Sequence, residues 1–67
     1  MKITLNNRPE SFNHEQISIS QLLEQKNYTF KMLVIKVNGK LVKKESYESF
    51  EIKDGDDVTV LHLVSGG

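Results

Sequence analysis

The chain has 67 residues, 37% of them apolar, and its nine basic and nine acidic side chains cancel. This length predicts a single small domain over residues 1–67 with a thin core, and zero net charge argues against a nucleic-acid-binding or membrane-surface protein. No apolar run is long enough to span a membrane and no signal peptide is recognisable. Cysteine is absent, which excludes disulfides, thiolate metal sites and cysteine nucleophiles. We therefore expect a cytoplasmic protein that is stabilised by packing alone.

The first segment alternates between apolar and polar residues. Ile3 and Leu5 share one face, which is typical of a half-buried strand. The pair Asn6-Asn7 suits a tight turn, because asparagine tolerates positive φ. A second strand is expected over residues 10–12. Pro9 has no N–H to donate, so this strand should lie at a sheet edge or begin just after the proline.

The stretch "SISQLLEQKN", residues 18–27, predicts a helix. Ser18 is a suitable N-cap, and Gln21 three residues later completes a capping box. The helical spacing gives one apolar stripe, formed by Ile19, Leu22 and Leu23. We expect the helix to end near Asn27, because "NYTF" is poor helix material.

The stretch "MLVIKVNGKLV" predicts a β-hairpin. It is rich in β-branched residues and is interrupted by Asn38-Gly39, a common two-residue hairpin turn. One face of the first strand carries Leu33, Ile35 and Val37. Residues 43–53 are polar and mixed, and we expect an irregular connection with a short helical turn over 46–49, anchored by Phe50 and Ile52.

The C-terminal third predicts a tight turn and a last strand. Gly55 in "DGDD" supplies the unusual backbone angle of the turn. The strand that follows has two faces, one with Val58, Val60, His62 and Val64 and the other with Thr59, Leu61 and Leu63. The element order predicts an α+β fold, with one mixed sheet of four to five strands packed on one main helix.

The last strand also suggests a docking surface. If Val58 and Val60 face the helix, Leu61 and Leu63 must point away from it, although burying each leucine would be worth roughly 1.5–3 kcal/mol. We therefore predict a partner-docking surface that includes Thr59, Leu61 and Leu63. The alternative is that Leu41 or Phe50 covers these leucines.

The sequence stops at "VSGG", and this ending suggests a reactive tail. Gly66 and Gly67 have no Cβ, so they can pass through a narrow channel and adopt backbone angles that other residues avoid. Val64 and the small Ser65 would form a flexible stem, giving a flexible tail over residues 64–67. We expect Gly67 to carry the chemistry.

These features together resemble the sulfur carrier proteins of the thiamin-biosynthesis (ThiS) family, within the ubiquitin-like β-grasp superfamily. The resemblance rests on "MKITLNNRPE", "SISQLLEQ", "VNG", "DGD" and the terminal "SGG", and spans nearly the whole chain. It implies that a ThiF-like, E1-like enzyme uses ATP to adenylate the Gly67 carboxylate. Sulfur from a cysteine desulfurase relay then displaces AMP, and the thiocarboxylate delivers sulfur to a ThiG-like thiazole synthase. The resemblance implies a carrier that binds no cofactor of its own.

Other functions stay open at this point. The small subunit of molybdopterin synthase shares the fold and the diglycine, and the carrier could serve another sulfur pathway such as tRNA thiolation. A plain β-grasp interaction module would use no terminal chemistry. A nucleic-acid-binding barrel is disfavoured, because stacking aromatics are lacking on the strands. The basic cluster of Lys36, Lys40, Lys43 and Lys44 instead indicates a solvated face or a contact with an acidic partner.

Catalysis and metal binding by this chain are not expected. No arrangement of serine, histidine and aspartate predicts a nucleophile paired with a base. His14 and His62 are far apart and lack the spacing of metal ligands.

Overall fold

The computed structural model describes residues 1–28 and 32–62. A five-stranded sheet has the order β2-β1-β7-β4-β5, and its strands are β1 (Lys2–Leu5), β2 (Arg8–Ser11), β4 (Leu33–Val37), β5 (Lys40–Val42) and β7 (Asp57–His62). A second, two-stranded sheet pairs β3 (Gln16–Ser18) with β6 (Glu51–Lys53). The helix α1 covers Ile19–Gln25, and a short 3-10 helix, η1, covers Lys44–Ser46. This is the ubiquitin-like β-grasp fold predicted from the sequence, with a two-stranded sheet that was not predicted.

The two hairpins form at the predicted asparagine turns. Asn6 and Asn7 have φ values of 50° and 67°, and Asn38 and Gly39 have φ values of 53° and 82°. These left-handed angles give the turn the same twist as its strands, and asparagine and glycine adopt them at low cost. The sequence therefore fixes the register of β1 with β2 and of β4 with β5.

The second strand begins earlier than predicted. It covers Arg8–Ser11, not residues 10–12, and so includes Pro9, which lies opposite Thr4. Met1 and Phe12 bond to each other in both directions through their backbones. Counting from that pair, the nitrogen of Pro9 faces outward, where the sheet ends and no neighbour needs an N–H. The prediction of an edge position is confirmed.

The capping box predicted for α1 is present. The Ser18 side chain accepts a hydrogen bond from the Gln21 backbone at 3.1 Å, and the Gln21 side chain accepts one from the Ser18 backbone at 2.8 Å. The helix ends at Gln25, and Asn27 follows with a left-handed φ of 57°. This agrees with an ending near Asn27, because a left-handed residue stops helical hydrogen bonding.

The connection from β5 to β7 is more ordered than predicted. The 3-10 helix lies at Lys44–Ser46, earlier than the helical turn expected over 46–49, and turns continue to Ser49. Ile52 is fully buried and Phe50 packs against the core, so both are the anchors that the sequence predicted. Ile52 also pairs with Ile17 across β3 and β6, which turns part of the expected irregular connection into a strand.

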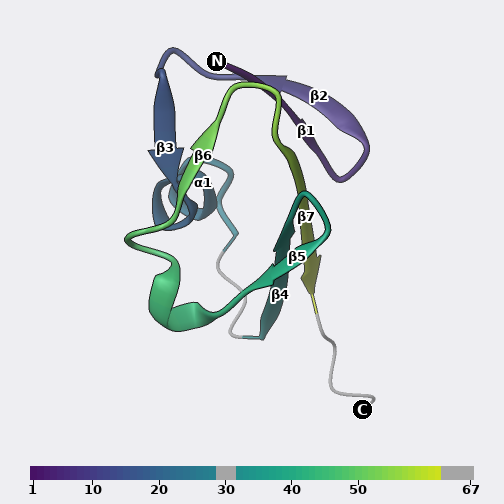
Figure 1. The fold of residues 1–67 in the computed structure, drawn as a ribbon, viewed down its shortest axis with the longest axis vertical. Coiled ribbons are helices and arrows are strands. Elements are labelled where there is room, and N and C mark those ends of the chain that lie inside the picture. The colour runs from purple at the N-terminus through teal and green to yellow at the C-terminus, as the bar shows by residue number, and fades with distance from the viewer. Residues whose placement is uncertain (29–31, 63–67) are drawn as a thin grey trace.

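The core lies between α1 and the five-stranded sheet. In Figure 1, α1, β3 and β6 lie together on one side of that sheet. The buried apolar residues come from the helix and from every strand except β2: Ile3, Leu5, Ile17, Ile19, Leu22, Ile35, Val37, Val42, Ile52, Val58 and Val60. Among the described residues no buried side chain is polar or charged. One face of the sheet is thus filled by the core, and the other is left open.

Candidate functional site

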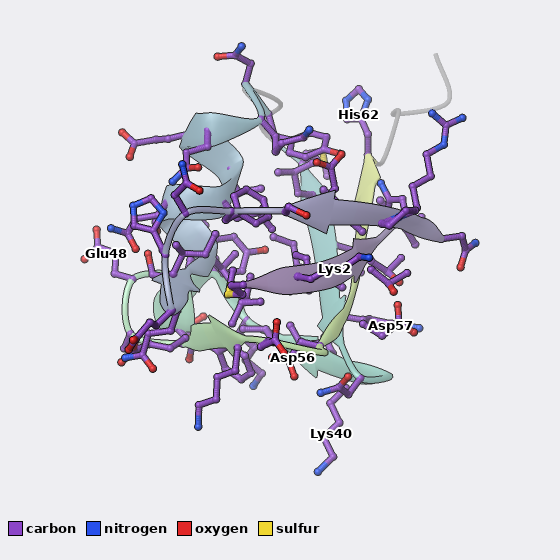
Figure 2. The ribbon with its side chains drawn as sticks, turned by 90° about the horizontal axis from the view of Figure 1, so that it is seen from above. Lys2, Lys40, Glu48, Asp56, Asp57 and His62 are labelled. Atoms are coloured by element: carbon purple, nitrogen blue, oxygen red, sulfur yellow. The ribbon has the colours of Figure 1, made fainter. Side chains whose placement is uncertain are left out.

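The whole of the predicted tail, and Leu63 before it, lies outside the described residues. Leu63, Val64, Ser65, Gly66 and Gly67 fall beyond His62, the last described residue, so their roles stay predictions. The structure describes instead the strand that leads to the tail. Figure 2 shows His62 at one end of β7 and the turn with Asp56 and Asp57 at the other.

The strand β7 lies in the middle of the sheet. It pairs in parallel with β1 and antiparallel with β4, and His62 lies opposite Leu33 in that second pairing. Val58 is completely buried and Val60 is 6% exposed, which confirms the predicted inward face of the strand for these two residues. A strand with neighbours on both sides gives the tail a rigid base.

The start of β7 is held by the two motifs that the sequence singled out. The Asn38 side chain donates to the Asp56 carboxylate at 3.1 Å and accepts from the Asp57 backbone at 2.9 Å. The same Asp56 carboxylate accepts from the Lys53 backbone at 2.9 Å. The motifs "VNG" and "DGD" therefore meet in space and act structurally, by fixing the turn that begins β7.

Further bonds attach β7 and its turn to the N-terminal hairpin. The Asn6 side chain, just after β1, accepts a hydrogen bond from the Val60 backbone at 2.8 Å, on the edge of β7 that faces β1. At the turn, the Asp54 carboxylate accepts from the Lys2 backbone at 2.6 Å. Short polar side chains thus position the turn before β7, the start of the strand and its middle.

The open face of the sheet carries the described part of the predicted docking surface. Strand pairing places Leu61 opposite Val34, and Thr59 opposite Lys36, which itself lies opposite Leu41. These five residues, Val34, Lys36, Leu41, Thr59 and Leu61, share the face turned away from α1, and we call them the open-face patch. The predicted orientation of Thr59 and Leu61 agrees with this register.

The open-face patch is accessible. Leu61 is 48% exposed, and Leu41 is 60% exposed beside it on the same face, so Leu41 does not bury Leu61. Phe50 packs against the core on the other side of the sheet. The alternative that these two residues cover the leucines is therefore wrong for Leu61.

The four lysines of the predicted basic cluster are not equivalent. All four are exposed. Lys40, Lys43 and Lys44 follow the hairpin turn, whereas Lys36 lies on the inner strand β4, within the open-face patch. In the part of the chain that the structure describes, the one ion pair joins Lys26 to Glu10 at 2.9 Å. Alternation along the strand predicted that Lys36 and Val34 share a face, but sequence reasoning missed the cross-strand neighbours of Lys36, because strand pairing decides them.

Within residues 1–28 and 32–62, no group of three or more His, Asp or Glu side chains could hold a metal ion. Burial raises the pKa of the Tyr47 hydroxyl above its usual value of 10.0. Tyr47 packs against the core and its backbone carbonyl accepts from the Ser20 backbone, so this shift reflects packing. No helix among the described residues is long and apolar enough to cross a membrane.

Comparison with known proteins agrees with the fold and the sequence motifs. The family model described as "ThiS family" matches residues 3–67. A crystal structure of the thiamine biosynthesis protein ThiS from Geobacter metallireducens has 26% identity and a TM-score of 0.90, with both chains fully covered. A solution structure of a thiamine biosynthesis protein from the same organism has 26% identity and a TM-score of 0.80, covering all of this chain and 88% of that one. No curated protein sequence matches. Because the family match covers nearly the whole chain, this protein belongs to the ThiS family.

Proposed function

We propose that this protein is a sulfur carrier for thiamin biosynthesis and that the C-terminal carboxylate of Gly67 carries the sulfur. The observation that supports this most directly is the family match over residues 3–67, which includes the diglycine. The similar structures from Geobacter metallireducens are thiamine biosynthesis proteins, which favours the same pathway here. The chain acts as a co-substrate of its partner enzymes in the cytoplasm.

The proposed chemistry activates a poor electrophile. An oxygen of the Gly67 carboxylate attacks the α-phosphate of ATP in a ThiF-like adenylating enzyme, and pyrophosphate leaves. The terminal sulfur of a persulfide, supplied by a cysteine desulfurase relay, then attacks the acyl-adenylate, forms a carbon–sulfur bond and releases AMP. A thiol reductant cleaves the sulfur–sulfur bond of the acyl disulfide so formed, and is itself oxidised to a disulfide. The resulting thiocarboxylate passes its sulfur to a ThiG-like thiazole synthase. The carrier itself needs no cofactor, since ATP is bound and consumed by the partner.

The described geometry suits this function. A reacting carboxylate must enter a cleft of the partner while the carrier body stays outside, and β7 supplies a rigid base held on both sides by hydrogen-bonded strands. Val64, Ser65 and Gly66 would form the stem that passes through the channel of the partner. Ser65 is small and Gly66 has no Cβ, so this stem needs little room. We further propose that the partner docks on Thr59, Leu61 and Leu63.

The test is the intact mass of the chain after incubation with ATP, the adenylating enzyme and a sulfur source. We expect a gain equal to the replacement of one oxygen by one sulfur, mapped to Gly67 by fragmentation. The gain should vanish in a variant without Gly67 and in one with an extra residue after Gly67. A mass that does not change with an adenylating enzyme of verified activity would exclude the proposal.

A second assay separates the acceptors. The sulfurated chain should deliver sulfur to thiazole synthase and should not replace the small subunit in molybdopterin synthase. Delivery only to the latter would assign the carrier to a different pathway while keeping its terminal chemistry.

A further inference from the structure

The open-face patch combines exposed apolar side chains with one central cation. Lys36 lies between Leu41 on one neighbouring strand and Thr59 on the other, and Val34 precedes it by two residues on the same face. Leu61 stands opposite Val34, so apolar groups border the lysine on two sides. A partner that covers Leu61 and Leu41 therefore has to cover Lys36 as well.

Lys36 has no anionic partner within the described chain. The one ion pair among residues 1–28 and 32–62 uses Lys26 and Glu10, which lie at the helix end and on β2. Asp57 is on the same face of the sheet, two positions before Thr59, yet it forms no ion pair with Lys36. Lys36 is exposed, so its ammonium group is open to solvent.

Docking would remove that water. Burying a lysine without a counter-charge costs several kcal/mol, which is more than a neighbouring leucine gains by burial. A purely apolar partner surface would therefore be opposed by Lys36. A carboxylate that faces the ammonium group would offset the loss of water and would also fix the orientation of the complex.

We propose that the adenylating enzyme binds the open-face patch with an apolar surface that contains a carboxylate facing Lys36. This inference rests on the proposed function, because it names the chemistry of the partner that the carrier function requires. It assigns Lys36 a role in orientation: one charge at the centre of the patch selects one way of seating the sheet on the enzyme.

The decisive variant is Lys36→Met, which keeps an unbranched side chain of similar length and removes its charge. If a carboxylate faces Lys36, the variant leaves that carboxylate buried against a thioether, and the Kd for the adenylating enzyme should rise about tenfold or more. Lys36→Arg keeps the charge and should stay within about threefold of the wild type. If the partner surface is purely apolar, Lys36→Met should bind as tightly as the wild type or more tightly, which would overturn the inference.

Lys53→Met is the matched control. Lys53 is exposed and lies on β6, in the two-stranded sheet, so the same loss of one charge occurs at a residue outside the open-face patch. Its Kd, measured by calorimetry at the same ionic strength, should equal that of the wild type. An equal weakening in Lys36→Met and Lys53→Met would indicate a general charge effect and contradict a specific carboxylate.

Leu61→Glu separates this inference from the proposed function. It should weaken binding strongly, because a carboxylate replaces the exposed leucine beside the proposed carboxylate of the enzyme. If Leu61→Glu binds normally and still gains sulfur, the patch is not the docking site: the inference and the proposed docking on Leu61 fail, whereas the sulfur-carrier function stands. If the wild-type chain neither binds the enzyme nor gains sulfur, both fail.

Discussion

The two faces of the five-stranded sheet are built from the same strands but differ in what they contact. On the face toward α1, β4 and β7 present Ile35, Val58 and Val60, which are buried. On the opposite face the same two strands present Lys36, Thr59 and Leu61, of which Leu61 is about half exposed. Alternation along a strand thus divides the sheet into a buried face and an exposed face. Substitutions on the two faces should therefore have separable effects.

Truncation of the helix core should have the largest effect on folding. Leu22 is fully buried in α1, so Leu22→Ala removes buried methyl groups and leaves a cavity, and we expect about 2–5 kcal/mol of lost stability. Leu61→Ala is the matched change on the open face and should cost no more than about 0.5 kcal/mol. Urea unfolding of both variants measures the difference, and equal losses would contradict the division between the faces.

The hydrogen bonds at the start of β7 should have the next largest effect. Asn38→Ala removes the side-chain bonds to Asp56 and Asp57 and places alanine at a left-handed φ of 53°, so we expect a loss of about 2–4 kcal/mol. Asn7→Ala also places alanine in a left-handed turn, at φ 67°, but no side-chain bond of Asn7 is lost. Its expected cost is about 1 kcal/mol.

The difference between these two asparagine variants isolates the side-chain hydrogen bonds from backbone strain. Thermal unfolding followed by circular dichroism measures both. If the two variants lose equal stability, the bonds between "VNG" and "DGD" contribute little and the turn conformation alone holds β7.

The smallest effect concerns alkaline pH. The pKa of Tyr47 is raised in the folded state by burial, above its usual value of 10.0. The unfolded chain therefore loses this proton first as the pH rises, so the stability present below about pH 10 decreases as the pH passes through the higher folded-state pKa. Denaturation midpoints from about pH 9 to about pH 11 should fall less steeply in Tyr47→Phe than in the wild type. Identical slopes would exclude a contribution from Tyr47.

Local features of this fold were predictable where neighbouring residues determine them. The capping box needs only Ser18 and Gln21, and the hairpin turn needs only Asn38 and Gly39, so both predictions are confirmed. The pairing of β3 with β6 was missed, because each strand has three residues and one buried isoleucine, Ile17 or Ile52. Such short strands carry no periodic signal and exist only through their long-range partner.

The candidate site was predictable to a similar extent. Alternation along the last strand was sufficient to predict that Leu61 faces outward. The assembly of Leu41, Lys36 and Thr59 across three strands depends on strand register, which no single segment encodes. Proximity in sequence grouped Lys36 with the lysines of the hairpin, but strand pairing places it on the open face of the sheet, among apolar neighbours.

The central place of β7 has a consequence for synthesis on the ribosome. The parallel pairing of β1 with β7 joins the first strand made to the last, and β4 completes its pairing only with that same strand. Contacts so distant in sequence form late and slowly. The nascent chain therefore cannot complete its sheet until residues 57–62 have left the exit tunnel. A product of premature termination would lack the middle of the sheet, remain unfolded and be open to proteolysis.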